Sequence, residues 1–333
     1  MVTIYDIAKQ AKTSAVTVSL ALRNSKRVSE ATREKIHKIA RKHGYRPNPL
    51  ARGLVGARTK TLAFVFNFSS VDLSQDLSYM EYFHAIAQAA ADKEYKIYFH
   101  SSNVALPIEE LISDISHHRV DGMILGTELD EQERKILKET DIPTVIVGKD
   151  ICSDKLTGVF TDDEDGIKQV VKHLLSLGHQ RIAFVGKNNS ETSIARYSGY
   201  CSTLKEANIR IDENLVIESD YHMDFGRQAG VQLAKLENRP SAIVAASDQL
   251  AIGIIAGLRS RGFKVPEDIS VTGYDNLHIA QFTSPTLTTV DLLRSESAKT
   301  IIDVLFDMIE KQGTGKRIMT PVKLIVREST RKI

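Results

Sequence analysis

The stretch Thr3–Leu22 constrains the chain most, because its pattern predicts two short helices separated by a tight break. Thr3 can cap the first helix, and Asp6 follows close to capping-box spacing, near the positive end of the helix dipole. Ser14 is placed to cap a second helix over 15–23. Apolar residues recur at helical spacing along the first helix as one stripe: Ile4, Ile7, Ala8 and Ala11.

The second helix has an outer face that is unusual for a helix in water. Val18, Ala21 and Leu22 are expected to face inward, which leaves small and apolar side chains partly or wholly outside. That outer set is Ala15, Val16, Thr17, Ser19 and Leu20. Such a face is explained if it fits a groove, which is the geometry of a helix-turn-helix whose second helix enters the DNA major groove.

Charge is distributed unevenly along the chain. Residues 1–60 contain fourteen Lys and Arg against three acidic residues, whereas the remainder contains thirty basic and thirty-nine acidic residues. A basic small domain joined to an acidic large one indicates a polyanion partner for the small domain only. A basic solvated tail is the alternative, but a tail would not carry helical periodicity and caps.

A third helix and a hinge complete the first sixty residues. Ser29 is expected to cap the third helix and Gly44 to end it, which gives a DNA-binding domain over 1–45. Pro47 and Pro49 exclude a continuous helix across them. Leu50–Leu54 is too short to be a stable helix alone, so residues 46–60 are predicted to form a hinge helix and linker that need a partner.

From Thr61 onward, apolar strand-like runs alternate with amphipathic helices. This alternation predicts parallel sheets in two doubly wound lobes, each with a crevice at the carboxyl ends of its strands. A last helix over 295–311 and a last strand over 322–326 must return to both lobes. We therefore expect an effector-binding and dimerisation domain over 61–333, with one lobe over about 61–160 and 291–319 and the other over about 161–290 and 320–333.

Other classes of protein fit the chain poorly. No apolar run approaches the roughly eighteen residues of a membrane span, and the N-terminus has no apolar signal-peptide core. Cys152 and Cys201 lack metal-ligand spacing, so we expect a reducing, cytoplasmic compartment. The acidic run Asp162–Asp165 precedes a helix, where the dipole favours acids, and no phosphate-binding motif or catalytic constellation is present. The sequence thus predicts no enzyme, cofactor or metal site, and it disfavours a periplasmic-type sugar-binding protein and a sugar-modifying enzyme.

With these features, the sequence resembles the lactose-repressor (LacI/GalR) family of bacterial transcription factors over essentially its whole length. The resemblance implies an all-α helix-turn-helix domain plus an α/β periplasmic-binding-protein-like domain. It also implies a homodimeric regulator of carbohydrate-utilisation genes, most often a repressor, with a sugar or sugar phosphate in the inter-lobe cleft. Whether the effector induces or co-represses stays open, as does a protein co-regulator. The matching segments are 2–8, 17–19, 28–29, 32–33, 44–48, 51–54, 177–179, 181–183, 247–248, 266–271, 273–275, 287–290 and 326–330, with Arg196 and Gly199.

The resemblance also implies which residues contact a roughly palindromic operator. Base readout falls to Ala15, Val16 and Leu20, and Leu20 replaces the Arg or His of many relatives, so only apolar contact, for instance with thymine methyls, is open to it. Leu54 is expected to wedge into the minor groove from a hinge helix. Ser14, Thr17 and Ser19 suit phosphate contacts. Further DNA contacts are expected from Thr3, Asn24, Asn48, Ala51 and Arg52.

For the effector, the resemblance implies a cluster at strand ends. Arg196 suits vicinal hydroxyls or a carboxylate, and Asp275 suits hydroxyl donors. An aromatic ring that stacks on a sugar is expected from Tyr221. The remaining members of the set are Ser247 or Asp248 and Phe282.

Two segments depart from the family. The loop over 67–80 lacks the usual Asn-Pro-Phe-Phe, and Val147-Gly148-Lys149 replaces an acidic residue in a way that is similar to maltose-responsive members. After the last strand no heptad extension for tetramer formation is present, so we expect a dimer.

Overall fold

The computed structural model describes residues 2–22, 25, 27–45, 58–67, 77–102, 107–126, 129–148, 152–153, 156–311 and 315–333. The predicted hinge helix lies outside the described residues, as does Lys149. The same holds for five expected DNA contacts: Asn24, Asn48, Ala51, Arg52 and Leu54.

Three helices form the first domain, and their predicted caps are largely confirmed. The Thr3 hydroxyl oxygen accepts from the Asp6 backbone N–H at 3.3 Å and the Thr3 N–H donates to the Asp6 carboxylate at 2.8 Å, which completes the capping box. Ser14 Oγ accepts from the Thr17 backbone N–H at 3.0 Å. Ser29 occupies the expected cap position, but its hydroxyl bonds the Thr32 hydroxyl at 2.8 Å and no backbone amide. The helices are α1 (Ile4–Ala11), α2 (Ala15–Leu22) and α3 (Glu30–Lys42).

The core of this domain is small and follows the predicted stripes. Gly44 stands in the left-handed region at φ 61° just after α3, as its expected role at the helix end requires. Leu22 is only half-buried, and Leu20 packs partly against the same core. The buried members are Ile7, Ala8, Ala11, Val18, Ala21, Val28 and Ile36.

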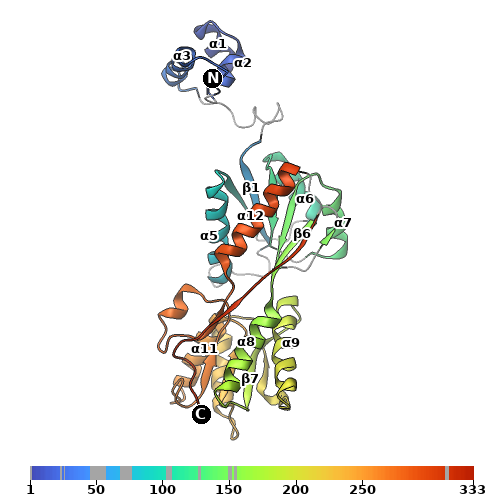
Figure 1. The fold of residues 1–333 in the computed structure, drawn as a ribbon, viewed down its shortest axis with the longest axis vertical. Coiled ribbons are helices and arrows are strands. Elements are labelled where there is room, and N and C mark those ends of the chain that lie inside the picture. Colours follow the sequence, from blue (N-terminus) through green and yellow to red (C-terminus); the bar gives the residue numbers. More distant parts are fainter. Residues whose placement is uncertain are drawn as a thin grey trace.

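The first lobe of the large domain has a seven-stranded sheet in the order β12-β6-β4-β3-β1-β2, with β5 pairing β6. All pairs on this path are parallel. Helices α5 and α12 lie side by side over one face of the sheet (Figure 1). Helices α6 and α7 belong to a second hydrophobic core of the same lobe. The elements are β1 (Thr61–Asn67), α5 (Leu77–Asp92), β2 (Lys96–Ser102), α6 (Ile108–His117), β3 (Gly122–Leu125), α7 (Glu131–Glu139), β4 (Thr144–Val147), β5 (Cys152–Ser153), β6 (Leu156–Thr161), α12 (Arg294–Lys311) and β12 (Arg317–Thr320).

The second lobe has a four-stranded parallel sheet in the order β10-β9-β7-β8. Its helices α8, α9 and α11 lie in the lower part of Figure 1, near the C-terminus. The elements are α8 (Asp163–Ser176), β7 (Ile182–Lys187), α9 (Glu191–Glu206), β8 (Val216–Glu218), α10 (Met223–Ala234), β9 (Ala242–Ala245), α11 (Asp248–Arg259) and β10 (Ser270–Thr272), with short 3-10 turns η1 (Glu213–Leu215) and η2 (His278–Gln281). Two doubly wound lobes are thus confirmed.

Within the described part of the chain, three segments cross between the lobes, at 161–163, 291–294 and 320–323. Next to two of these crossings, β11 (Thr289–Asp291) pairs antiparallel with β13 (Lys323–Ile325). The expected return of the last helix and strand is therefore observed. Helix α12 covers the first sheet, whereas β13 pairs with β11 and packs against α8 of the second lobe. None of the described helices is long and apolar enough to cross a membrane.

Helices α10 and α11 approach so closely that their contact depends on glycine. A Cβ atom at Gly253 would lie 2.1 Å from the Met223 carbonyl oxygen and 2.8 Å from the Arg227 backbone nitrogen. Both neighbours are backbone atoms, so neither can rotate away, and a larger residue must push the helices apart.

We therefore expect Gly253→Ala to lower the free energy of unfolding by about 2 kcal/mol or more, although Ala is the better helix former. Urea unfolding followed by circular dichroism measures this loss. Gln228→Ala, at an exposed position of α10, is the matched control and should change stability by less than about 0.5 kcal/mol. A Gly253→Ala variant as stable as the parent would contradict the close packing.

Candidate functional site

The outer face of the helix-turn-helix is dominated by two apolar or aromatic side chains. Val16, the second residue of α2, is 68% exposed, and Tyr5 on α1 is 73% exposed. Ala15 and Leu20 are half-buried and pack against the domain core. Of the three predicted base-reading residues, Val16 is therefore the one that stands free.

The hydroxyl groups expected at phosphates are partly engaged within the protein. Ser14 Oγ and Thr17 Oγ1 lie 2.9 Å apart, and the Thr3 hydroxyl donates to the Asp6 carboxylate at 2.7 Å. A phosphate oxygen accepts hydrogen bonds, so the Thr3 hydroxyl would have to release the Asp6 carboxylate before it could donate to a phosphate. Tyr5 was not singled out from the sequence, and its side chain lies on the exposed side of α1.

The effector candidates form a buried cluster around Arg196 on α9. Its Nε donates to Asp163 Oδ1 at 2.9 Å, and its Nη2 lies 3.6 Å from Asp275 Oδ1. Nη1 donates to the Ala246 carbonyl oxygen, and the guanidinium lies 3.8 Å from the centre of the Tyr274 ring. Burial by itself would lower the pKa of Arg196, but the two carboxylates raise it above its usual value, so the side chain is charged.

Asp275 and Tyr221 contribute backbone strain as well as polar groups. Their φ angles are 110° and 70°, in the left-handed region that non-glycine residues rarely adopt. Such residues cost about 1–3 kcal/mol each and concentrate at ligand clamps. The Tyr221 hydroxyl oxygen is buried and makes no hydrogen bond within the described residues, so it is available to a ligand.

Ser247 and Asp248 are already engaged in structural bonds. Ser247 Oγ caps α11 by accepting from the Leu250 N–H at 3.2 Å. The Asp248 carboxylate accepts from the Thr289 hydroxyl at 2.6 Å and from the Leu277 N–H at 2.7 Å. Asp248 thus ties the start of β11 (Thr289–Asp291) to the loop after β10.

Phe282 lies apart from the other candidates. Its side chain is 70% exposed, and its ring centroid lies 5.1 Å from that of His278. Because Arg196 is buried and Phe282 faces outward, the structure does not bring the two together.

Asp163 and Tyr274 are members of the cluster that were not predicted from the sequence. The acidic run was assigned to the start of a helix, and Asp162 indeed caps α8 by accepting from the Asp165 N–H at 3.0 Å. The next residue, Asp163, instead turns to Arg196. Its place directly after β6, at the carboxyl edge of a strand, is the signal that marks it. No group of three or more His, Cys, Asp or Glu side chains among the described residues has the arrangement of a metal site.

The burial of Asp248 generates a pH-dependent prediction. Burial, and then repulsion from Asp275, raises the pKa of Asp248 to about 8 from its ordinary value of 3.8. Above pH about 4 the unfolded chain releases this proton, whereas the folded protein keeps it up to pH about 8. The contribution of Asp248 to the free energy of unfolding therefore falls steadily as the pH rises from about 4 to about 8. Asn mimics the protonated acid. We expect Asp248→Asn to gain about 1–3 kcal/mol in unfolding free energy relative to the parent between pH 5 and pH 8.

Chemical denaturation of both proteins across that pH range measures the difference. His173 and His179 titrate in both, and burial lowers the pKa of each, so their contributions cancel in the comparison. Parallel pH profiles for the two proteins would show that Asp248 is ionised throughout.

Comparison with known proteins agrees with this architecture. Residues 3–48 match the family model described as bacterial regulatory proteins, lacI family, and residues 171–330 match the periplasmic binding protein-like domain. The repressor PurR of Vibrio atlanticus is 31% identical over 99% of this chain and 98% of its own length, and the repressor CytR of Escherichia coli is 31% identical over 99% and 96%.

Solved structures give the same result. The lac repressor dimer bound to operator and the anti-inducer ONPF is similar with a TM-score of 0.85, at 26% identity over 99% of both chains. The CelR–cellobiose complex has a TM-score of 0.73, at 27% identity over 99% of this chain and 100% of that one. The chain belongs to the lacI family of bacterial regulatory proteins, and it is a DNA-binding transcriptional regulator rather than an enzyme.

Proposed function

We propose that this protein is a homodimeric repressor of carbohydrate-utilisation genes, released from a roughly palindromic operator by a neutral sugar in the inter-lobe cleft. The observation that carries the effector assignment is the buried cluster of Arg196, Asp163, Asp275 and Tyr221 at the carboxyl edge of the second lobe. Buried, strained and charged groups at a strand edge are the chemistry of a small-molecule site.

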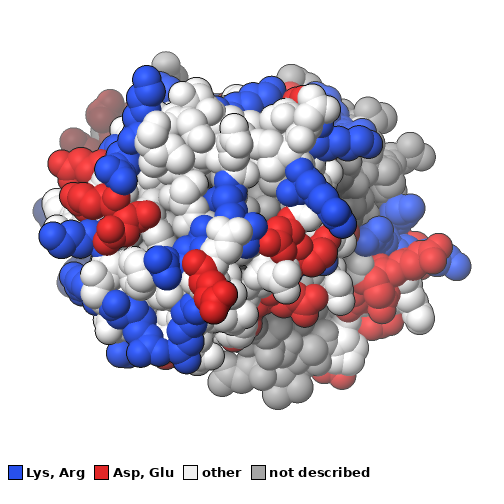
Figure 2. Space-filling model, turned by 90° about the horizontal axis from the view of Figure 1, so that it is seen from below, with Lys and Arg blue, Asp and Glu red and all other residues white. Residues whose placement is uncertain are grey.

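Operator recognition is assigned to the apolar outer face of α2. Val16 offers methyl groups and no hydrogen-bond donor, so it fits a thymine methyl in the major groove. Sequence-independent affinity is assigned to the basic first sixty residues. The face of the molecule at the C-terminal end has Lys and Arg interspersed with Asp and Glu and offers no single-sign field for a polyanion (Figure 2). A minor-groove wedge by Leu54 remains part of the proposal.

A neutral sugar is favoured over a sugar phosphate by the charge count of the described cluster. The single positive charge of Arg196 is balanced by Asp163 and Asp275, which leaves an excess of one negative charge. A ligand phosphate would be repelled, whereas sugar hydroxyls can donate to the carboxylates. The solved CelR complex with the neutral sugar cellobiose is consistent with this chemistry.

The dimer surface is assigned to exposed apolar side chains that span both lobes. Tyr79, Met80 and Phe99 belong to the first lobe, and Ile279 and Phe282 to the second. Met80 and His278, which precedes Ile279 in the chain, line one cavity, so these parts of the two lobes lie close together. An apolar patch of this kind is the usual mark of a protein interface, and the similar lac repressor structure is a dimer. Phe282 fits this surface better than the effector cleft.

Two further assignments belong to the proposal. The cytoplasm is the compartment in which a DNA-binding regulator meets its operator. The division at 45, 60, 160, 290 and 319 places the helix-turn-helix, the linker and the two lobes in separate units, as the sequence predicts.

The operator assignment predicts a specific effect of Val16→Ala. An operator selected from a random DNA pool by the parent protein should bind the variant roughly fivefold more weakly, because about 1 kcal/mol of apolar contact is lost. Fluorescence anisotropy at several salt concentrations measures this loss. The slope of log affinity against log salt should not change, since no phosphate contact is removed. A variant with unchanged affinity and base preference would contradict major-groove readout by Val16.

The effector assignment predicts which ligands stabilise the protein. In a thermal-shift screen, a neutral mono- or disaccharide from a panel including cellobiose, ribose and maltose should raise the Tm, and its phosphorylated form should not. Tyr221→Phe should weaken binding about tenfold by removing one hydrogen bond. Phe282→Ala is the matched control and should bind as the parent does. Stabilisation by sugar phosphates alone would refute the neutral-sugar assignment.

A further inference from the structure

We infer that Arg294 is a latch that ties the first turn of α5, in the first lobe, to the second-lobe loop that carries Asp275. The inference rests on the proposed function only in taking Asp275 as an effector contact. The latch makes the effector loop and α5 move as one unit, which gives the cleft a direct mechanical link to the other lobe.

Arg294 itself joins three separate segments. It is the first residue of α12, stands at one of the crossings between the lobes and is only 9% exposed. Its Nη2 donates to Ser78 Oγ at 2.9 Å, and its Nη1 lies 3.8 Å from Glu81 Oε2. Nη1 also donates to the Asp275 backbone carbonyl oxygen. One buried guanidinium therefore contacts α5 and the effector loop together.

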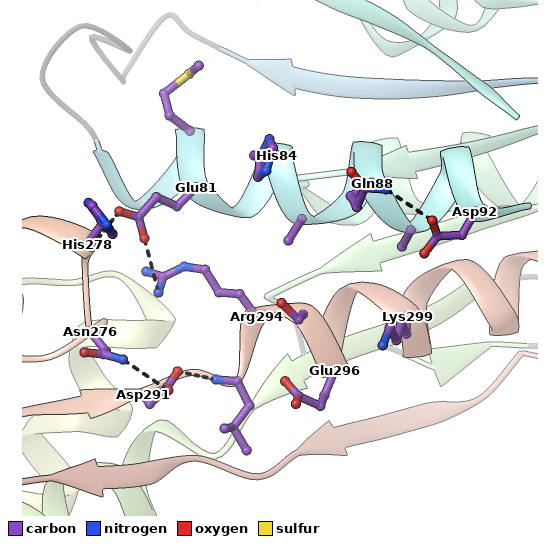
Figure 3. A pocket seen from close by; sticks show the side chains of 15 residues that line it. Glu81, His84, Gln88, Asp92, Asn276, His278, Asp291, Arg294, Glu296 and Lys299 are labelled. Atoms are coloured by element: carbon purple, nitrogen blue, oxygen red, sulfur yellow. Dashed lines mark hydrogen bonds and ion pairs between the residues drawn. The ribbon is translucent and has the colours of Figure 1, made fainter.

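Further bonds hold the same turn of α5 to the second lobe. Glu81 Oε1 accepts from the His278 backbone N–H at 2.8 Å (Figure 3). The Glu81 carboxylate therefore contacts both Arg294 and the loop after Asp275. The Leu77 backbone N–H donates to Gln249 Oε1, on α11, at 3.2 Å. These contacts satisfy polar groups of the helix start that would otherwise need water.

The backbone that presents the latch is strained. Leu293, Asn276 and Asp275 have φ angles of 49°, 48° and 110°. Asp291 holds the two turns together, because its carboxylate accepts from the Leu293 N–H at 2.8 Å and from Asn276 Nδ2 at 3.1 Å (Figure 3). Strain that is maintained by several bonds at a crossing is typical of a switch region.

The latch connects to the effector cluster through one residue. The Asp275 carboxylate faces Arg196 at 3.6 Å, while its carbonyl group is held by Arg294. A ligand that moves the backbone of Asp275 as it draws the carboxylate from Arg196 also moves the carbonyl group that Arg294 holds, and we expect α5 to move with it. A cavity of about 840 Å³ borders Arg294, Glu81 and His278 and runs along α5 and α12 (Figure 3).

Hydrogen–deuterium exchange of the full-length protein without any sugar tests the latch. In Arg294→Met, we expect peptides covering 77–82 and 275–282 to exchange about tenfold faster, although they belong to different lobes. Glu81→Gln should accelerate the same two peptides to a smaller degree. In the double variant the effects should fall short of additive, because both changes break one network.

Lys299→Met is the matched control, since Lys299 lines the same cavity on α12 but makes none of the latch contacts. It should leave both peptides unchanged. If Arg294→Met does not fold, the same exchange measurement is made on Arg294→Lys and Glu81→Gln. Lys keeps the positive charge but cannot form the forked set of contacts that a guanidinium makes. Faster exchange in 294–300 alone, with 77–82 unaltered, would overturn the latch. Since no sugar is present, this outcome is independent of the effector assignment.

Discussion

The second lobe depends on the neutralisation of one buried charge. A guanidinium as deeply placed as that of Arg196 is expensive to remove from water unless carboxylates and carbonyl oxygens surround it. Its partners come from the start of α8, from the end of β9 and from the loop after β10. Pairing of this charge therefore requires three chain segments to meet at one edge of the sheet. A buried carboxylate or guanidinium left without its partner would be costly. The need to pair Arg196 therefore both brings these segments together and places polar groups at the cleft.

Much of this architecture is encoded in local sequence patterns. The capping box of Thr3 and Asp6, the Ser14 cap and the stop at Gly44 all depend on neighbours within a few residues, so the sequence predicts them correctly. The alternation of strands and helices likewise predicts two parallel lobes, because parallel strands need helical crossovers. The strands β5, β6, β11 and β12 were not predicted, and β6 and β12 show why. Gly158 interrupts the first, and the second is a short sheet-edge strand with mostly exposed side chains, so neither carries an apolar run.

Site residues were harder to predict because their roles depend on contacts between distant segments. Asp163 and Arg196 are 33 residues apart, and the acidic run around Asp163 is equally suited to a helix start. Phe282 shows the opposite difficulty: an aromatic residue near a strand end suits a sugar platform, whereas its side chain is 70% exposed and lies apart from Arg196. The sequence likewise gives no sign of the Arg294 network, because its partners Ser78 and Asp275 lie on elements of different lobes.

The two recognition sites proposed for this protein would use opposite physical means. If Val16 reads the operator as proposed, its exposed side chain costs little in the free protein and contributes affinity only when a groove excludes water from it. In the second lobe, by contrast, the buried charges of Arg196, Asp163 and Asp275 are already paired with one another before any ligand arrives. A ligand that engages Asp275 must exchange existing bonds, whereas one that engages the Tyr221 hydroxyl can add a bond. Exchange of bonds at Asp275 changes what the Arg294 network holds, whereas simple addition of bonds would leave the first lobe untouched.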